Sequence, residues 1–199
     1  MRDLEKENFR RKTLSFYKYV KIENPKEMRD CLFDKVENLG CLGRIYVAHE
    51  GINAQMNVPE HNWEAFDKFI QNTKEFAGVP YKMAVEEKGK GIQSSFLKLI
   101  IKVRPKIVAD GLDDSTFNPS DTGAYATAED VNNMIDRGVT VIDMRNMYEA
   151  AIGHFENAKL MNVDTFREQL AKVTDMFKDK KDEEVLLYCT GGIRCEKAS

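Results

Sequence analysis

The sequence predicts two domains of different class, an α+β domain followed by an α/β domain with a parallel sheet. In residues 14–103, apolar segments of strand and helix type follow one another in the order β-α-β-β-α-β, with room for one more strand. From residue 127 onward, continuous apolar strands alternate with amphipathic helices, which is typical of a parallel sheet covered on both faces. Between them, residues 110–124 are rich in turn formers, so we expect a linker that joins domains 1–109 and 125–199.

The first domain has five strand candidates and two helices. The strands are expected at residues 14–20, 42–49, 52–58, 81–85 and 96–103. The first helix starts at Pro25, with Asn24 as its N-cap, and ends at Gly40. The second helix starts after Pro59. This order is the split βαβ pattern of ferredoxin-like domains, in which helices cover one face of the sheet and leave the other face open.

The second domain begins with a helix capped by Thr127, with Asp130 at the far end of a capping box. Its apolar face consists of Val131, Met134 and Ile135. Strands are expected at residues 139–143, 158–163 and 185–188, with a polar loop after Asp143 and a helix over residues 166–177. Reactive residues in such sheets lie beyond the carboxyl ends of the strands.

Composition describes an ordinary globular chain of 199 residues, 42% hydrophobic and 32% charged. No apolar run reaches the length of a membrane span and no signal region follows Met1, so we expect a cytoplasmic protein. Four cysteines without C-x-x-C spacing argue against a disulfide scaffold and against a structural zinc site. Residues 1–109 carry 20 Lys and Arg against 15 Asp and Glu, which fits a polyanionic partner or simply an uneven surface.

The chemistry is expected at Cys189. It follows the apolar strand 185–188 and precedes two glycines and a helix start, a geometry that surrounds a sulfur with backbone N–H groups. The start of the helix and the guanidinium of Arg194 should lower the pKa of the thiol and favour the thiolate. The predicted anion-binding loop consists of Thr190, Gly191, Gly192, Ile193 and Arg194.

The other cysteines are assigned less specific roles. Cys195 is interpreted first as a small packing residue of the helix and second as a candidate to resolve an oxidised Cys189 as a disulfide. Cys31 and Cys41 are interpreted as core residues. A cysteine phosphatase is disfavoured, because Cys189 and Arg194 are five positions apart rather than six and the loop suits a sulfur-sized anion better than a phosphate.

The last helix has only begun when the sequence stops at Ser199. A single turn buries almost nothing, and without a covering helix the strand that delivers Cys189 would leave an apolar surface exposed. We therefore expect that the C-terminal part of the second domain is missing from this chain.

Three motifs of the second half resemble the signatures of the rhodanese domain. They are Asp143 to Glu149, Gly153 to Ala158, and Cys189 to Arg194. Asn157 stands where glycine is usual, a mild departure because Asn also tolerates left-handed backbone geometry. With Glu50 to Gln55 in a ferredoxin-like first domain, the chain is similar to the bacterial rhodanese-like tRNA uridine hydroxylases, the TrhO family formerly called UPF0176.

This resemblance implies a function and several residue roles. Members form 5-hydroxyuridine at the wobble position of tRNA and use molecular oxygen, so tRNA is the expected partner and no stable protein partner is expected. Asp143, Arg145 and His154 are expected to have structural roles, as in rhodaneses. His49 and Asn53 join two strands, and a hairpin role and a contact to RNA or to the Cys189 pocket are equally open.

A cluster of basic residues near the end of the first domain offers a second route to RNA. Its members are Lys82, Lys88, Lys90, Lys98, Lys102, Arg104 and Lys106. If they lie on one face with Tyr81 or Phe96, the basic side chains would contact a phosphate backbone and the aromatic ring would stack on a base. The alternative, a face that is simply solvated, is equally open.

Three functions remain open from the sequence. The first is oxygen-dependent tRNA uridine hydroxylation with Cys189 as the reactive group, an oxidoreductase activity. The second is a sulfurtransferase that carries a persulfide on Cys189. The third is a binding module without catalysis. The sequence contains no flavin fingerprint, metal-ligand cluster or haem ligation pattern, so no cofactor or metal is identifiable and molecular oxygen is implied by the resemblance alone.

Overall fold

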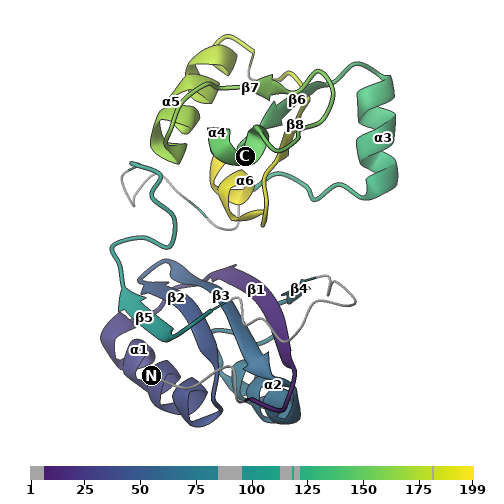
Figure 1. Cartoon of the computed structure of the whole chain (residues 1–199). Coiled ribbons are helices and arrows are strands. Elements are labelled where there is room, and N and C mark those ends of the chain that lie inside the picture. The colour runs from purple at the N-terminus through teal and green to yellow at the C-terminus, as the bar shows by residue number, and fades with distance from the viewer. Residues whose placement is uncertain (1–6, 85–95, 113–117, 119–121, 181) are drawn as a thin grey trace. The chain divides into compact units, whose positions relative to one another are not determined.

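The protein is described by a computed structural model, which covers the chain except residues 1–6, 85–95, 113–117, 119–121 and 181 (Figure 1). The chain divides into two compact units, Met1–Ile107 and Val108–Ser199, which we describe separately. The sequence predicts the ends of the linker between residues 109 and 110 and between residues 124 and 125, and these domain boundaries stay predictions. Among the described residues, no helix is both long and apolar enough to cross a membrane.

The first unit contains a five-stranded mixed sheet in the order β4-β1-β3-β2-β5. Its elements are β1 (Arg11–Tyr19), α1 (Pro25–Asn38), β2 (Leu42–Ala48), β3 (Gly51–Pro59), the short 3-10 helix η2 (Glu60–Asn62), α2 (Trp63–Asn72), β4 (Lys82–Met83) and β5 (Leu99–Val103). The order 4-1-3-2 of the first four strands is that of the split βαβ pattern, which confirms the predicted α+β class. The additional strand β5 lies outside β2 and runs parallel to it.

Local sequence explains how these elements begin and turn. The Oδ1 of Asn24 accepts a hydrogen bond from the backbone N–H of Glu27 at 3.2 Å, and Pro25 occupies the first helical position, as predicted. At the β2–β3 turn, a Cβ on Gly51 would lie 2.0 Å from the carbonyl oxygen of Lys18. Only glycine allows β1 and β3 to approach so closely there.

The two helices of this unit lie on one face of the sheet (Figure 1). That face is the core, and Leu32, Val36, Phe66 and Ile70 of the helices are at most 1% exposed. Cys41 is also buried, as predicted. Cys31 is exposed, so its assignment to the core was wrong. The buried stripe of α1 is centred on Leu32 and Val36, and the position before Leu32 lies about 100° around the helix from it.

The second unit contains a three-stranded parallel sheet in the order β7-β6-β8, which confirms the predicted α/β class. Its elements are α3 (Ala128–Asp136), β6 (Thr140–Asp143), α4 (Met147–Ala150), β7 (Lys159–Leu160), α5 (Phe166–Phe177), β8 (Val185–Tyr188) and α6 (Ile193–Ala198). Ile142, Met144, Phe166 and Leu170 form the centre of its core. The Thr127–Asp130 capping box of α3 forms as predicted.

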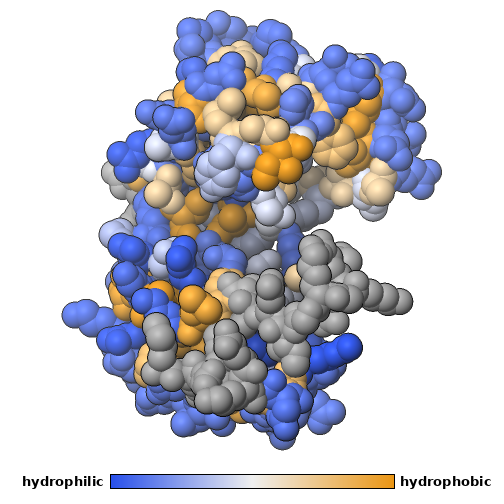
Figure 2. Space-filling model, in the orientation of Figure 1, coloured by the Kyte–Doolittle hydropathy of each residue, from blue (hydrophilic) through white to orange (hydrophobic). Residues whose placement is uncertain are grey.

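One sequence prediction in this unit needs correction. The loop predicted after Asp143 contains helix α4, because Asn146 and Glu149 form a capping box in which the Asn146 backbone N–H donates to Glu149 Oε2 at 3.0 Å. The predicted apolar face of α3 is confirmed, since Val131, Met134 and Ile135 are its half-buried residues, and none of them is fully buried. Apolar side chains are also visible at the surface of this unit (Figure 2), with Ile152 at 90% exposure as the extreme case.

Candidate active site

The candidate active site is the loop that joins β8 to α6. Strand β8 ends at Tyr188, Cys189 follows at once, and α6 begins at Ile193. Gly192 has a left-handed φ of 88°, which glycine adopts without strain. This turn directs the Gly192 backbone N–H to the sulfur of Cys189, with an N–Sγ distance of 3.0 Å. The strand, the tight loop and the helix lie as the sequence predicts.

The loop stabilises the thiolate of Cys189. The pKa of this thiol is lowered to about 4, first by a hydrogen bond from the Cys195 thiol and then by the backbone N–H groups of Cys195, Gly191 and Arg194, against the opposing effect of burial. The same hydrogen bond raises the pKa of Cys195, so Cys195 stays a protonated donor. Cys195 also packs against the core of this unit, so it combines the packing role with a direct contact to the reactive sulfur.

A carboxylate that the sequence analysis did not single out holds the other side of the loop. Glu149 on α4 accepts two hydrogen bonds from the Arg194 guanidinium, at 2.7 and 3.0 Å, and one from the hydroxyl of Thr190. These donors, Arg194 first, lower the pKa of Glu149 to about 2. Burial opposes the charge of Arg194, yet its pKa is raised by Glu149 and then by the Cys189 thiolate. Two sequence signals pointed toward Glu149, the capping pattern at Asn146 and its place at the end of the rhodanese-like motif that begins at Asp143.

The residues expected to have structural roles form one cluster beside the loop. Asp143 Oδ2 accepts hydrogen bonds from Arg145 Nη2 and from the hydroxyl of Tyr188, both at 2.7 Å. Arg145 also donates to the carbonyl oxygen of Gly153 and lies over the ring of Tyr188, 5.2 Å from its centroid. His154 Nδ1 lies 3.2 Å from the carbonyl oxygen of Ala150. These contacts tie β6, β8 and the loop after α4 together, and the structural roles of Asp143, Arg145 and His154 stay a prediction.

His49 and Asn53 belong to the first unit, and both contact backbone there. His49 Nδ1 lies 3.0 Å from the carbonyl oxygen of Ile22, and Asn53 Nδ2 donates to the carbonyl oxygen of Ile107 at 3.1 Å. Gln55 donates a short hydrogen bond to Asn53. The β2–β3 turn by itself needs neither His49 nor Asn53. These hydrogen bonds to backbone give both residues a structural role within the first unit. A contact of either residue with RNA stays a prediction.

The predicted basic cluster does not form one surface with Tyr81. Lys88 and Lys90 lie outside the described residues. Tyr81 packs edge-on against Trp63, with 5.5 Å between the ring centroids, and adjoins the core, so its ring is not an open platform. Lys82 and Lys102 are exposed on strands β4 and β5.

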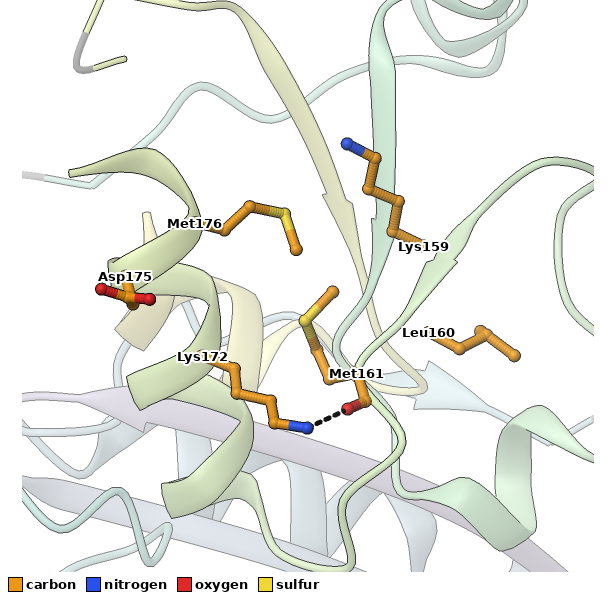
Figure 3. A pocket seen from close by; sticks show the side chains of 6 residues that line it. All are labelled: Lys159, Leu160, Met161, Lys172, Asp175 and Met176. Carbon is orange, nitrogen blue, oxygen red and sulfur yellow. Dashed lines mark hydrogen bonds between the residues drawn. The ribbon is translucent and has the colours of Figure 1, made fainter. Parts of the chain in front are cut away.

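A hollow of about 420 Å³ between β7 and α5 is a second concave feature of this unit (Figure 3). It is lined by Lys159, Leu160, Met161, Lys172, Asp175 and Met176. The Lys172 ammonium donates to the carbonyl oxygen of Met161 at 3.0 Å. Cys189 does not line this hollow, so we assign the hollow no part in the chemistry of the cysteine loop. Among the residues that the structure describes, no group of His, Cys, Asp or Glu could hold a metal ion.

We expect Cys189 to react as a thiolate over the whole neutral range. With a pKa of about 4, its alkylation by iodoacetamide should change little between about pH 5 and pH 8, whereas an ordinary thiol accelerates up to about pH 8.5. Cys195→Ala removes the leading cause of the shift, so the rate should become pH-dependent in this range. Cys31→Ala, at an exposed site in the other unit, is the matched control and should change nothing. Because Cys31 is exposed and reacts too, alkylation is followed at the Cys189 peptide by mass spectrometry, and a wild-type profile at Cys189 that rises through pH 8 would contradict the expectation.

Comparison with known proteins gives matches along nearly the whole chain. The model of the UPF0176 acylphosphatase-like domain matches residues 11–107, and that of the rhodanese-like domain matches residues 127–199. A protein named tRNA uridine(34) hydroxylase from Leptospira interrogans is 51% identical over 98% of this chain and 53% of its own length. Proteins of the same name from Enterobacter sp. and Salmonella typhimurium are 51% and 49% identical over 94% and 95% of this chain. The chain spans about half the length of the curated relatives it matches.

Proposed function

Because the chain belongs to the UPF0176 family, with its acylphosphatase-like domain followed by a rhodanese-like domain, we propose that it acts in the hydroxylation of uridine 34 of tRNA. The observation that carries this proposal is the identity of about half of all residues with proteins named tRNA uridine(34) hydroxylase, over nearly the whole chain. The product is 5-hydroxyuridine, tRNA is the partner, and the cytoplasm is the place of action.

The reactive group in this proposal is the thiolate of Cys189. Uracil is electron-poor at C6, and addition of the thiolate there forms a C–S bond and moves an electron pair toward C5. An oxygen atom added at C5, followed by loss of the C5 proton and of the thiolate, restores the ring. With molecular oxygen as co-substrate, the second oxygen atom leaves as water, and two electrons and two protons come from a reductant. In the alternative route, molecular oxygen and the same reductant first convert the Cys189 thiol to a sulfenic acid and water, and transfer of the sulfenic oxygen to C5 in exchange for its hydrogen returns the thiol.

The chain's own residues have separate tasks in this scheme. The N–H groups of the loop and the Cys195 thiol hold the sulfur as an anion. Arg194, fixed by Glu149, adds positive charge beside the sulfur and beside any anion that develops on the bound base. Asp143, Arg145 and Tyr188 are positioning residues, because they tie the loop to the neighbouring strand.

The second candidate function is sulfur transfer, favoured by the same loop. A cradle of N–H donors around Cys189 also suits a persulfide, in which the outer sulfur carries the charge. In this function Cys189 would take the outer sulfur of thiosulfate as a stable persulfide, with release of sulfite. Cyanide would then accept that sulfur as thiocyanate and return the thiolate. A binding module without catalysis, the third candidate, would retain its effect after Cys189→Ser.

Nucleoside mass spectrometry on bulk tRNA tests the proposal. A strain that lacks the gene is complemented with the whole gene, either wild type, Cys189→Ala or the control Cys31→Ala. We expect 5-hydroxyuridine to return with the wild type and with Cys31→Ala and to stay at background with Cys189→Ala. Full hydroxylation by Cys189→Ala would remove the thiolate from the mechanism. A change in a thiolated nucleoside without 5-hydroxyuridine would identify the protein as a sulfurtransferase.

A further inference from the structure

The face of the first unit's sheet that bears no helix differs in chemistry from the core face. Side chains of a strand alternate between the two faces. Phe16, Ile45 and Ala54 point to the helices and are at most 2% exposed. Their neighbours Tyr17 and Tyr46 point the other way and are partly exposed.

Strand register places two rows of side chains next to each other on this open face. One row crosses four strands and consists of Tyr17, Asn53, Tyr46 and Lys102. The adjacent row consists of Lys82, Ser15, Gln55, Arg44 and Ile100. The two tyrosines therefore flank β3, with about 10 Å between their strands, since neighbouring strands are about 4.8 Å apart. Both rings lie among polar and basic side chains.

The charge of the sheet is of one sign. The five strands contain Arg11, Lys12, Lys18, Arg44, Lys82 and Lys102 and neither Asp nor Glu. On the opposite side of the sheet the charges are mixed, because α1 carries four acidic and three basic residues and α2 carries two acidic residues and one basic residue. Arg11 is paired with Glu7, and Lys12 and Lys18 contact Trp63 and the Ala77 carbonyl, so we leave these three out. Arg44, Lys82 and Lys102 are exposed.

The exposed cations are placed directly at the two rings. Lys82 Nζ lies 5.6 Å from the centroid of the Tyr17 ring. Arg104, which follows β5, has its Cζ 5.3 Å from the centroid of the Tyr46 ring. Proteins bind single-stranded nucleic acid with this combination, in which bases stack on aromatic rings and nearby cations pair with the phosphates. A base that stacks on either ring would meet a cation within reach of its own phosphate.

We propose that this open face binds the single-stranded anticodon loop of tRNA, with two bases on Tyr17 and Tyr46 and the backbone on Arg44, Lys82, Lys102 and Arg104. The proposal rests on the proposed function, because it takes tRNA as the substrate of the whole protein. The spacing of about 10 Å between the strands exceeds the 3.4 Å of stacked neighbours, so the two bases are unstacked from each other. A loop offers bases in that state, whereas a paired stem does not.

Binding of a labelled anticodon stem–loop RNA to the whole protein tests this inference, with a fully paired duplex of the same composition as the second probe. We expect Tyr17→Ala and Tyr46→Ala each to weaken binding of the stem–loop by roughly 5- to 150-fold, the range for loss of one stacked base. Tyr17→Phe and Tyr46→Phe keep the ring and should bind like wild type. The duplex should bind weakly to all of these proteins, without discrimination among them.

Salt dependence gives a readout that misfolding would not produce. Lys102 is exposed, so Lys102→Gln should leave the fold intact and reduce the slope of log K against log salt by about 0.7, the value for one lost phosphate contact with a single strand. Lys68→Gln, on α2 and also exposed, is the matched control on the opposite side of the sheet and should leave the slope unchanged.

The results separate this inference from the function it rests on. If the tyrosine-to-alanine variants bind the stem–loop like wild type and still restore 5-hydroxyuridine in cells, the open face is not the binding site and the hydroxylase proposal stands. If the variants lose affinity for stem–loop and duplex equally, the face does not read unstacked bases and the inference is overturned. If wild type restores no 5-hydroxyuridine, the proposed function fails, whatever the binding shows.

Discussion

Replacing Asp110 by Asn should destabilise the second unit by about 3–5 kcal/mol, the usual result of leaving one charge of a buried pair without its partner. Asp110 Oδ2 lies 2.7 Å from the ammonium nitrogen of Lys197, and both side chains are completely buried. Asn keeps the shape of Asp110 and its acceptor for the Leu112 backbone N–H, so the variant removes charge and little else. Chemical denaturation of the whole protein, followed through the transition of the second unit, gives the free energy of unfolding.

Two control variants test whether burial of the ion pair causes the expected loss of stability. The pair Arg137–Glu184 has a similar distance of 3.0 Å, but its side chains are 60% and 55% exposed, so Glu184→Gln should change stability by at most about 1 kcal/mol. The double variant Asp110→Leu with Lys197→Met replaces the buried pair by apolar groups and should lose less than Asp110→Asn alone. A loss below about 1 kcal/mol in Asp110→Asn would mean that water reaches this pair in solution.

This ion pair also matters for the reactive loop. Lys197 lies on α6, three residues after Arg194, and Asp110 lies at the start of the second unit. The segment that the sequence predicts to be a linker therefore holds the helix whose first turn supplies backbone N–H groups to Cys189. Turn-forming residues indicate an irregular segment, and they contain no information about which charged side chain it buries.

Elements with a strong local signal were predicted well. The bounds of α5 and β8 agree with the sequence prediction to the residue, because an apolar repeat and a short apolar run define them without help from the rest of the chain. The cysteine loop was predicted for the same reason, since a strand, two glycines and a helix start are contiguous in sequence. The sequence order of strands also indicated the sheet of the first unit.

Features that depend on contacts between distant residues were missed. Glu149 and Arg194 form an ion pair although they are 45 positions apart in the sequence, and no local sequence pattern predicts that pair. The open sheet face was expected as a face, but Tyr17 and Tyr46 were not, because a partly exposed tyrosine in a strand is ambiguous until register shows what stands beside it. Cys31 was misplaced for a related reason, since helical spacing alone did not define how wide the buried stripe of α1 is.

In the proposed hydroxylation, Glu149→Gln should uncouple Arg194 from the loop and lower the formation of 5-hydroxyuridine on the order of 10²-fold, as misplacement of catalytic groups by about 1 Å commonly does. Gln has the same shape but loses the charge that binds the guanidinium through two contacts of 2.7 and 3.0 Å. Nucleoside mass spectrometry in the complemented strain measures the loss. Unchanged product in Glu149→Gln would show that Arg194 needs no anchor.

The pH dependence of stability distinguishes this role of Glu149 from a general packing role. The pKa of Glu149 is about 2 in the folded protein against an ordinary value of 4.5, so its ionised form stabilises the fold above about pH 4.5. That contribution, on the order of 2–3 kcal/mol for a side chain only 19% exposed, disappears as the pH falls from about 4.5 to about 2.

Asp143 titrates in the same direction, so the quantity to compare is the difference in the free energy of unfolding between wild type and Glu149→Gln at each pH. The difference should be largest at neutral pH and vanish near pH 2. Glu183→Gln is the control, because that carboxylate is more exposed and its pKa is lowered mainly by the neighbouring Lys180, so its difference should have the same sign and be much smaller. A Glu149 difference that is equally large at both ends of the range would assign its effect to shape rather than to the charge that holds Arg194.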